Sequence, residues 1–306
     1  MKYKLAVILG LVWVLTLAGC NYRLGVVAQA PQPTRQQSKA SLLPRLSQAF
    51  QSTPLTYHIE IYNSVVMGKI RSYGVSLPPG YEQNLNQRYP VIFLLHGGHG
   101  NPSHWFDKNK GAALTTLQEL YTTGKLPPSI IITPDGNDKR GSSRYWDPQY
   151  IDGPHGNVST AIGDELVKVV QSRYRTLPNP DFWAIGGLSS GGWGAINVGL
   201  HHLDHFSILF SHSGYFVDSS GPDNSPIEYI KTLPAQAKQR LRIYLDTGTA
   251  DRAYLKQAIQ FHQVLDEVNI PNEFNQFPGP HSWKYWRQHL ADSLTFVGQQ
   301  MQAITN

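Results

Sequence analysis

Hydrophobic and polar positions alternate along two segments near residue 60 and then give way to short, continuously apolar runs. Residues 56–64 (TYHIEIYNS) and 69–77 (KIRSYGVSL) alternate with a period of two, which predicts two half-buried strands joined as an antiparallel hairpin. Five later runs are continuously apolar, as is typical of parallel strands that are buried on both faces. They cover residues 90–95 (PVIFLL), 129–133 (SIIIT), 182–185, 206–210 and 241–245.

The stretches between these apolar runs have helical periodicity. Residues 158–174, for example, place Ile162, Leu166 and Val170 on one face of a predicted helix. Further helices are predicted over residues 112–122, 192–202 and 251–269. Alternating strands and helices predict an α/β fold with a mostly parallel central sheet and helices on both faces. Because no repeat or linker interrupts residues 56–306, we expect them to form a single domain.

The first 55 residues have a different character. Lys2 and Lys4 precede an almost wholly apolar stretch, which predicts a secretory signal peptide over residues 1–19. The sequence Leu-Ala-Gly-Cys that ends at Cys20 resembles the bacterial lipoprotein box, and Cys20 is the only cysteine in the chain. This resemblance implies lipidation of Cys20 and a lipid-anchored protein of the bacterial cell envelope, facing the periplasm or the exterior. Residues 20–55 are rich in Gln, Ser, Pro and Ala, which predicts a flexible tether.

The net positive charge of the chain comes from its first 55 residues. The 306-residue chain has a formal charge of +5 and a pI near 9.1, values that invite a nucleic-acid partner. Six of its 26 basic residues precede position 56 and none of its 21 acidic residues does, so the remainder has 20 basic against 21 acidic residues. The predicted domain therefore lacks the basic surplus that phosphate neutralisation requires, and we expect no nucleic-acid partner.

A glycine-rich turn, GGLSSGG, follows the predicted strand at 182–185. Residues 187–191 match the pattern G-x-S-x-G with Ser189 at the centre, and the pattern occurs once in the chain. In a nucleophile elbow the serine occupies a strained strand-to-helix turn, and the flanking glycines avoid steric overlap there. Ser189 is therefore the candidate nucleophile, in preference to Ser190. The alternative is a structural turn that closes a helix–sheet contact.

A second glycine-rich loop, HGGHG, follows the predicted strand at 90–95. It resembles the HGG-type oxyanion loop, in which backbone N–H groups stabilise a negatively charged oxygen. The N–H of Gly98 is the preferred donor and that of His99 the second choice. The backbone N–H of Ser190 would form the other half of the oxyanion hole.

The same loop offers a metal site as a competing interpretation. It would combine the imidazoles of His96, His99 and His104 with the carboxylate of Asp107. Because a glycine-rich loop is a poor scaffold for such a site, we predict no metal and no cofactor.

A catalytic base and an acid are expected at strand ends nearer the C-terminus. His281 lies in the loop PGPHSW after a predicted strand, the position of the last member in the order Ser, acid, His. Asp251 is the preferred acid, because a loop carboxylate can turn toward the histidine, whereas Asp246 is still on its strand. The structural alternatives are a helix N-cap for Asp251 and a strand-end contact for Asp246.

Taken together, these segments resemble the esterase D-type branch of the α/β-hydrolases, which includes feruloyl and acetyl xylan esterases. The resemblance spans about residues 57–290 and is carried by VIFLLHGGHGN, AIGGLSSGGWGA, GTAD and PHSWKYWRQHL. It implies an α/β-hydrolase fold and supports Asp251 and His281. One departure is Ser190, where family members often have methionine.

These observations predict a serine esterase that acts on a small-molecule or polysaccharide-linked ester by an acyl-enzyme mechanism. The alternatives are an acyltransferase that uses a sugar or lipid hydroxyl in place of water, and a non-catalytic envelope protein on a hydrolase scaffold. Four further residues are candidates for the substrate pocket: His99, Trp105, His212 and Trp146. The segment 141–155 (GSSRYWDPQYIDGPH) is either a binding loop or a capped surface turn.

Overall fold

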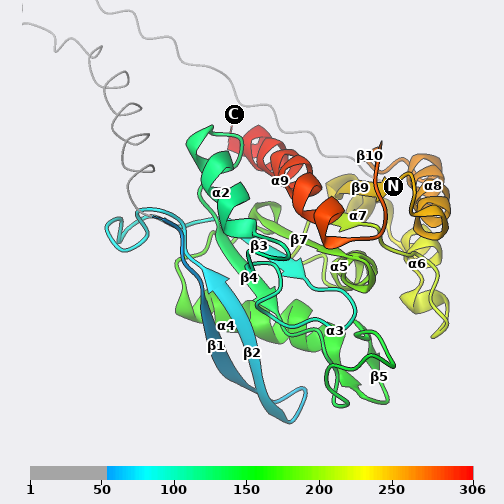
Figure 1. Cartoon of the computed structure of the whole chain (residues 1–306), viewed down its shortest axis with the longest axis horizontal. Helices are drawn as coiled ribbons and strands as arrows, with labels where there is room; N and C mark the ends of the chain where they lie inside the picture. Colours follow the sequence, from blue (N-terminus) through cyan, green and yellow to red (C-terminus); the bar gives the residue numbers. More distant parts are fainter. Residues whose placement is uncertain (1–53, 306) are drawn as a thin grey trace, which may run out of the picture. The chain divides into compact units, whose positions relative to one another are not determined.

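An eight-stranded sheet organises the computed structural model, which describes residues 54–305 (Figure 1). The strands lie in the order β1-β2-β4-β3-β7-β8-β9-β10. They are β1 (His58–Ser64), β2 (Lys69–Ser76), β3 (Val91–Leu95), β4 (Ile130–Pro134), β7 (Trp183–Leu188), β8 (Ile208–His212), β9 (Arg242–Gly248) and β10 (Asn272–Phe277). The predicted signal peptide, tether and lipidated Cys20 lie outside the described residues.

The sheet is parallel except at its N-terminal edge. The predicted hairpin is present: β1 pairs antiparallel with β2, and β2 pairs antiparallel with β4. From β4 to β10 every neighbouring pair is parallel. Two short strands, β5 (Asp152–Gly153) and β6 (Gly156–Asn157), form a separate small hairpin.

Helices cover both faces of the sheet. They are α2 (Ala113–Thr122), α3 (Val158–Thr160), the π-helix η1 (Ala161–Glu165), α4 (Leu166–Arg173), α5 (Ser190–His201), α6 (Pro226–Thr232), α7 (Ala235–Arg240), α8 (Arg252–Glu267) and α9 (Trp283–Thr305), with 3-10 turns η2 (Pro180–Phe182) and η3 (Pro222–Asn224). The helix predicted over 158–174 is therefore one helical stretch with a π-helical turn inside it.

Alternation along the central strands builds two hydrophobic layers. On β3, Phe93 points into a layer shared with α4, α5 and α8, whereas Ile92 and Leu94 point into a layer shared with α2 and α9. All five β3 side chains are fully buried, which explains why this strand is a continuous apolar run.

The longest helix, α9, was absent from the sequence-based prediction. Its buried positions Leu290, Leu294, Val297 and Met301 recur every three or four residues, as expected for one face of a helix. The first turns, WKYWRQH, are aromatic and cationic, so this segment was interpreted as part of a site and not as the start of a helix.

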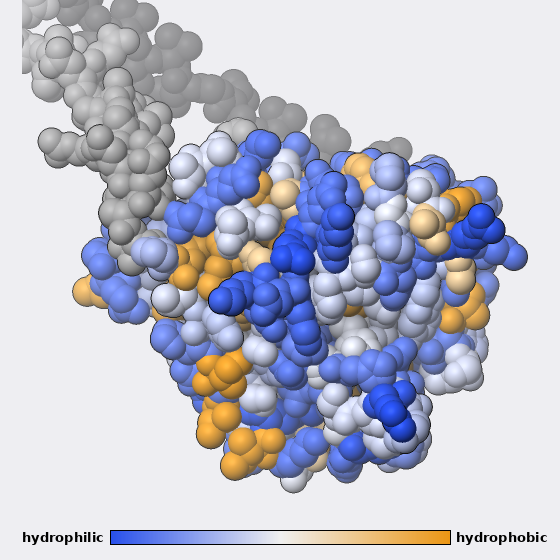
Figure 2. Space-filling model, viewed as in Figure 1, coloured by the Kyte–Doolittle hydropathy of each residue, from blue (hydrophilic) through white to orange (hydrophobic). Residues whose placement is uncertain are grey.

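The outer face of the β1–β2 hairpin carries exposed apolar side chains. Ile59, Ile61 and Ile70 are 49%, 59% and 65% exposed, and Val65 in the connecting turn is 83% exposed. Figure 2 shows this apolar area at the lower left of the molecule.

Among residues 54–305, no helix is long and apolar enough to cross a membrane.

Candidate active site

Ser189 lies at a sharp turn between the end of β7 and the start of α5. Its backbone has φ 54° and ψ −126°, a conformation that few non-glycine residues adopt. There is no room for a side chain at either flanking glycine. A Cβ at Gly187 would overlap the backbone of Gly191, and a Cβ at Gly191 would overlap the carbonyl of His96. The local geometry is that of a nucleophile elbow, as the pattern G-x-S-x-G predicts.

His281 connects Ser189 to a carboxylate. Its Nε2 lies 2.9 Å from the Ser189 Oγ, and its Nδ1 lies 2.6 Å from Oδ2 of Asp251. Asp251 is at the N-cap position of α8, yet its side chain does not cap that helix. The structure thus brings the three predicted residues into one hydrogen-bonded chain. In it the Asp251 carboxylate bonds to His281 and does not cap α8.

The rejected candidate acid, Asp246, is used elsewhere. It is 1% exposed on β9, where Oδ2 lies 2.7 Å from Nδ1 of His212 and Oδ1 accepts a hydrogen bond from the Tyr285 hydroxyl at 3.0 Å. Nε2 of His212 lies 3.0 Å from the hydroxyl of Ser293 on α9. Asp246 therefore belongs to a buried polar network that joins β8, β9 and α9.

The two predicted oxyanion donors belong to two segments that meet at Ser189, because a Cβ on Gly97 would lie 3.2 Å from the Ser189 Cβ. Gly98 is half-buried in the loop after β3, and Ser190 is fully buried at the first position of α5. The Ser190 hydroxyl has no hydrogen-bond partner among the described residues, whereas the Ser189 hydroxyl lies at hydrogen-bond distance from His281. The N–H groups of the α5 N-terminus also favour negative charge at this point.

Two aromatic residues that the sequence-based prediction missed surround the histidine. The ring of Tyr254 stacks on His281 at 4.2 Å between centroids, and the edge of Trp286 meets His281 at 4.8 Å. Burial raises the pKa of Tyr254, while its interaction with the Ser189 hydroxyl works in the opposite direction. The position of Tyr254, three residues after Asp251 on a helix, is the signal that could have identified it.

The four predicted pocket residues have different positions. Trp105 is 1% exposed, and its indole donates to the Leu95 carbonyl at 2.9 Å. His212 is fully buried in the polar network. Both predictions were wrong, because each side chain packs in the core and offers no surface to a substrate. His99 is exposed beside Gly98, and Trp146 is half-buried, with its indole bonded to the Gly141 carbonyl.

Two of the three imidazoles of the competing metal site, those of His96 and His104, have other partners. His96 accepts the Gly136 N–H at 2.9 Å, and its other nitrogen lies 2.9 Å from the Gly97 carbonyl. Lys110 lies 2.5 Å from Nε2 of His104, and burial, followed by the charge of Lys110, lowers the His104 pKa to about 4. Within the described part of the chain, no group of three or more His, Cys, Asp or Glu residues is placed to hold a metal.

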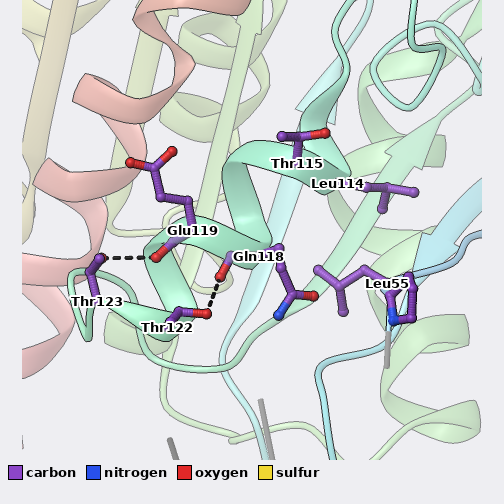
Figure 3. Close-up of a pocket in the computed structure, with 8 residues that line it drawn as sticks. Leu55, Leu114, Thr115, Gln118, Glu119, Thr122 and Thr123 are labelled. Carbon is purple, nitrogen blue, oxygen red and sulfur yellow. Dashed lines mark hydrogen bonds between the residues drawn. The ribbon is translucent and has the colours of Figure 1, made fainter. Parts of the chain in front are cut away.

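A groove of 430 Å³ lies elsewhere, on the outer surface of α2 (Figure 3). It is lined by Pro54, Leu55, Leu114, Thr115, Gln118, Glu119, Thr122 and Thr123. None of these residues belongs to the site around Ser189.

Comparison with known proteins identifies esterases that are similar to this chain. The chain is 29% identical over 256 residues to an esterase of Mycobacterium tuberculosis, a match that covers 69% of this chain and 52% of that protein. It is 23% identical over 243 residues to an acetyl esterase of Caldicellulosiruptor saccharolyticus, covering 70% and 85% of the two chains. The chain spans only 22% to 56% of the length of three other curated matches, among them a xylanase of Acetivibrio thermocellus.

Solved structures and a family model agree with these matches. A ferulic acid esterase structure superimposes with a TM-score of 0.73 at 26% identity, covering 80% of this chain and 98% of the other. This similarity and the sheet order confirm the predicted α/β-hydrolase fold. The model of the Esterase family, described as "Putative esterase", matches residues 64–297. The chain therefore belongs to this esterase family.

Proposed function

We propose that this protein is a serine carboxylic-ester hydrolase in which Ser189, His281 and Asp251 form the catalytic triad. The observation that carries the proposal is the continuous chain from Ser189 Oγ through His281 to Asp251, with distances of 2.9 and 2.6 Å. Family membership supports ester hydrolysis as the reaction class. The names of the matched acetyl esterase and ferulic acid esterase point to acetyl and feruloyl esters, and the match to a xylanase favours esters carried by a polysaccharide.

The geometry supports a mechanism in two steps. His281 Nε2 takes the Ser189 proton as Oγ attacks the ester carbonyl, and the oxyanion lies between the N–H groups of Gly98 and Ser190. The imidazolium then gives that proton to the departing alcohol, leaving an acyl-serine. Water, deprotonated by His281, attacks the acyl carbonyl, and the imidazolium then returns the proton to Ser189 Oγ as the acid is released. Asp251 fixes the histidine tautomer and stabilises the imidazolium.

The proposal includes a location outside the cytoplasm. Its support is the sequence alone: the apolar leader with Lys2 and Lys4, and Cys20 at the position of a lipoprotein box. A lipid anchor at Cys20 would hold the enzyme at the surface of the membrane.

Hydrolysis of short-chain 4-nitrophenyl esters by the full chain tests the proposed activity. Ser189→Ala should lower kcat by about 10³-fold or more, because the nucleophile acts together with its base. Ser172→Ala is the matched control, since Ser172 is exposed on α4 and bonds only to its own helix. Equal rates for wild type and Ser189→Ala would refute the proposal.

A further inference from the structure

One carboxylate beside the candidate active site has no part in the proposed reaction. Asp147 lies in the tryptophan- and tyrosine-rich segment between β4 and β5. Its side chain lies against Gly98: a Cβ placed on Gly98 would overlap Oδ1 of Asp147 and lie 3.9 Å from Oδ2. The carboxylate is therefore next to the amide that we assign to the oxyanion hole.

The protein does not neutralise this carboxylate. Asp147 is exposed, and among the described residues it makes no hydrogen bond and no ion pair. The two arginines of the neighbouring sequence are engaged elsewhere. Arg140 lies 2.6 Å from Asp138, and Arg144 donates to the Tyr145 hydroxyl at 2.8 Å.

The charge of Asp147 reaches two tyrosines, of which Tyr254 interacts with Ser189 and His281. Burial is the main cause that raises the pKa of both Tyr254 and Tyr215, and the negative charge of Asp147 raises both further. Tyr254 is the residue that stacks on His281. Asp147 thus contributes a negative potential to the space in which a substrate would meet Ser189.

This potential has a consequence for substrate choice. A carboxylate beside a developing oxyanion opposes the reaction of a neutral ester, and it opposes that of an anionic ester more strongly. A cationic group on the substrate, close to the reacting carbonyl, would compensate the carboxylate and be attracted to it. We propose that Asp147 is a specificity-determining residue that selects esters with a positive charge near the scissile carbonyl, an inference that rests on the proposed esterase activity.

Two pairs of isosteric esters test this selection. They also show whether Asp147 recognises a positive charge on the alcohol side or on the acyl side of the carbonyl. On the alcohol side the pair is acetylcholine and 3,3-dimethylbutyl acetate. On the acyl side it is betaine ethyl ester and ethyl 3,3-dimethylbutanoate. Within each pair a quaternary nitrogen replaces a carbon. Its inductive effect on the carbonyl is the same for every variant, so a change in the ratio of the kcat/KM values between variants isolates the charge of residue 147. The full-length wild type is compared with Asp147→Asn, with the charge-conserving Asp147→Glu, and with Glu82→Gln, which removes an exposed carboxylate from the segment between β2 and β3.

We expect Asp147→Asn to lower the ratio of cationic to neutral ester by about three- to tenfold in at least one pair, as for a partly exposed charge pair. Glu82→Gln should keep the wild-type ratio, and Asp147→Glu should retain most of it. Added salt should reduce the ratio of the wild type more than that of Asp147→Asn, because screening weakens a charge–charge interaction.

A merely structural effect would slow both members of a pair equally. If Asp147→Asn leaves both ratios unchanged while the wild type hydrolyses these esters, the selection by Asp147 is refuted and the esterase activity stands. If the wild type hydrolyses 4-nitrophenyl esters but none of these four esters, the selection is also refuted. If it hydrolyses none of these esters and no 4-nitrophenyl ester, the proposed function itself fails.

Discussion

Two aspartates that are five residues apart, Asp246 and Asp251, have different environments. Asp251 is 6% exposed and bonds to His281, whereas Asp246 is 1% exposed and lies against His212 and Tyr285. The sequence favoured Asp251 because it follows its strand, and the hydrogen bonds agree with that choice. The sequence did not reveal the partner of Asp246, because His212 is distant along the chain and the two meet only through strand pairing.

This difference predicts opposite effects for the same substitution. Asp251→Asn should lower kcat by about 10³-fold or more, because the amide no longer holds the histidine in the reactive tautomer. Its free energy of unfolding should stay within about 1 kcal/mol of wild type. Asp246→Asn should instead lower the free energy of unfolding by about 3 kcal/mol, because it leaves His212 and Tyr285 without a buried anionic partner. Urea unfolding and ester kinetics on both variants measure these two effects. A large loss of stability in Asp251→Asn together with a large loss of kcat alone in Asp246→Asn would contradict the prediction.

At the level of elements, local signals predicted the strands and the two glycine-rich loops. Each central strand is buried on both faces, so its apolar run was visible without knowledge of its neighbours. The burial of Trp105 and His212 was not visible, because it depends on α2 and α9 packing over the strand ends. Tyr254 approaches His281, and Asp147 approaches Gly98, from segments that only the folded chain brings together.

The loop between β3 and α2 gives a pH-dependent contribution to stability through His104. Burial and Lys110 lower the pKa of His104 from 6.5 to about 4 in the folded protein. Between these two values the unfolded chain binds more protons, so the free energy of unfolding falls as the pH falls from 6.5 to 4. After solvent screening we expect a loss of about 1–2 kcal/mol.

Replacing His104 should remove this dependence. Urea unfolding of His104→Gln and wild type at several values between pH 7 and pH 4.5 measures the difference in slope. The variant should lose less stability over this range, because glutamine does not titrate. Identical slopes would show that His104 is not buried as described.

At the level of the whole molecule, charge is unevenly divided along the chain. The basic surplus lies before residue 56, so the family domain is close to neutral. Such a domain has no basic surplus that would attract it to an anionic membrane surface. The proposed lipid at Cys20 would provide the attachment instead.

The proposed lipid anchor makes a prediction that is independent of catalysis. Metabolic labelling with a palmitate analogue in a bacterial host should modify the full chain, and Cys20→Ser should abolish the label. The variant should keep the ester hydrolysis of the wild type, because Cys20 is outside the family domain. Undiminished labelling of Cys20→Ser would contradict the anchor and leave the enzymatic proposal intact.

The central claim is that Ser189 is the nucleophile activated by His281. The most direct test is to react the full chain with a fluorophosphonate and to locate the adduct by mass spectrometry of peptides. We predict modification of Ser189 alone, at a rate that His281→Ala lowers by at least about 10²-fold because the general base is removed. An adduct on Ser190 or any other residue, or a rate that His281→Ala leaves unchanged, would contradict the account.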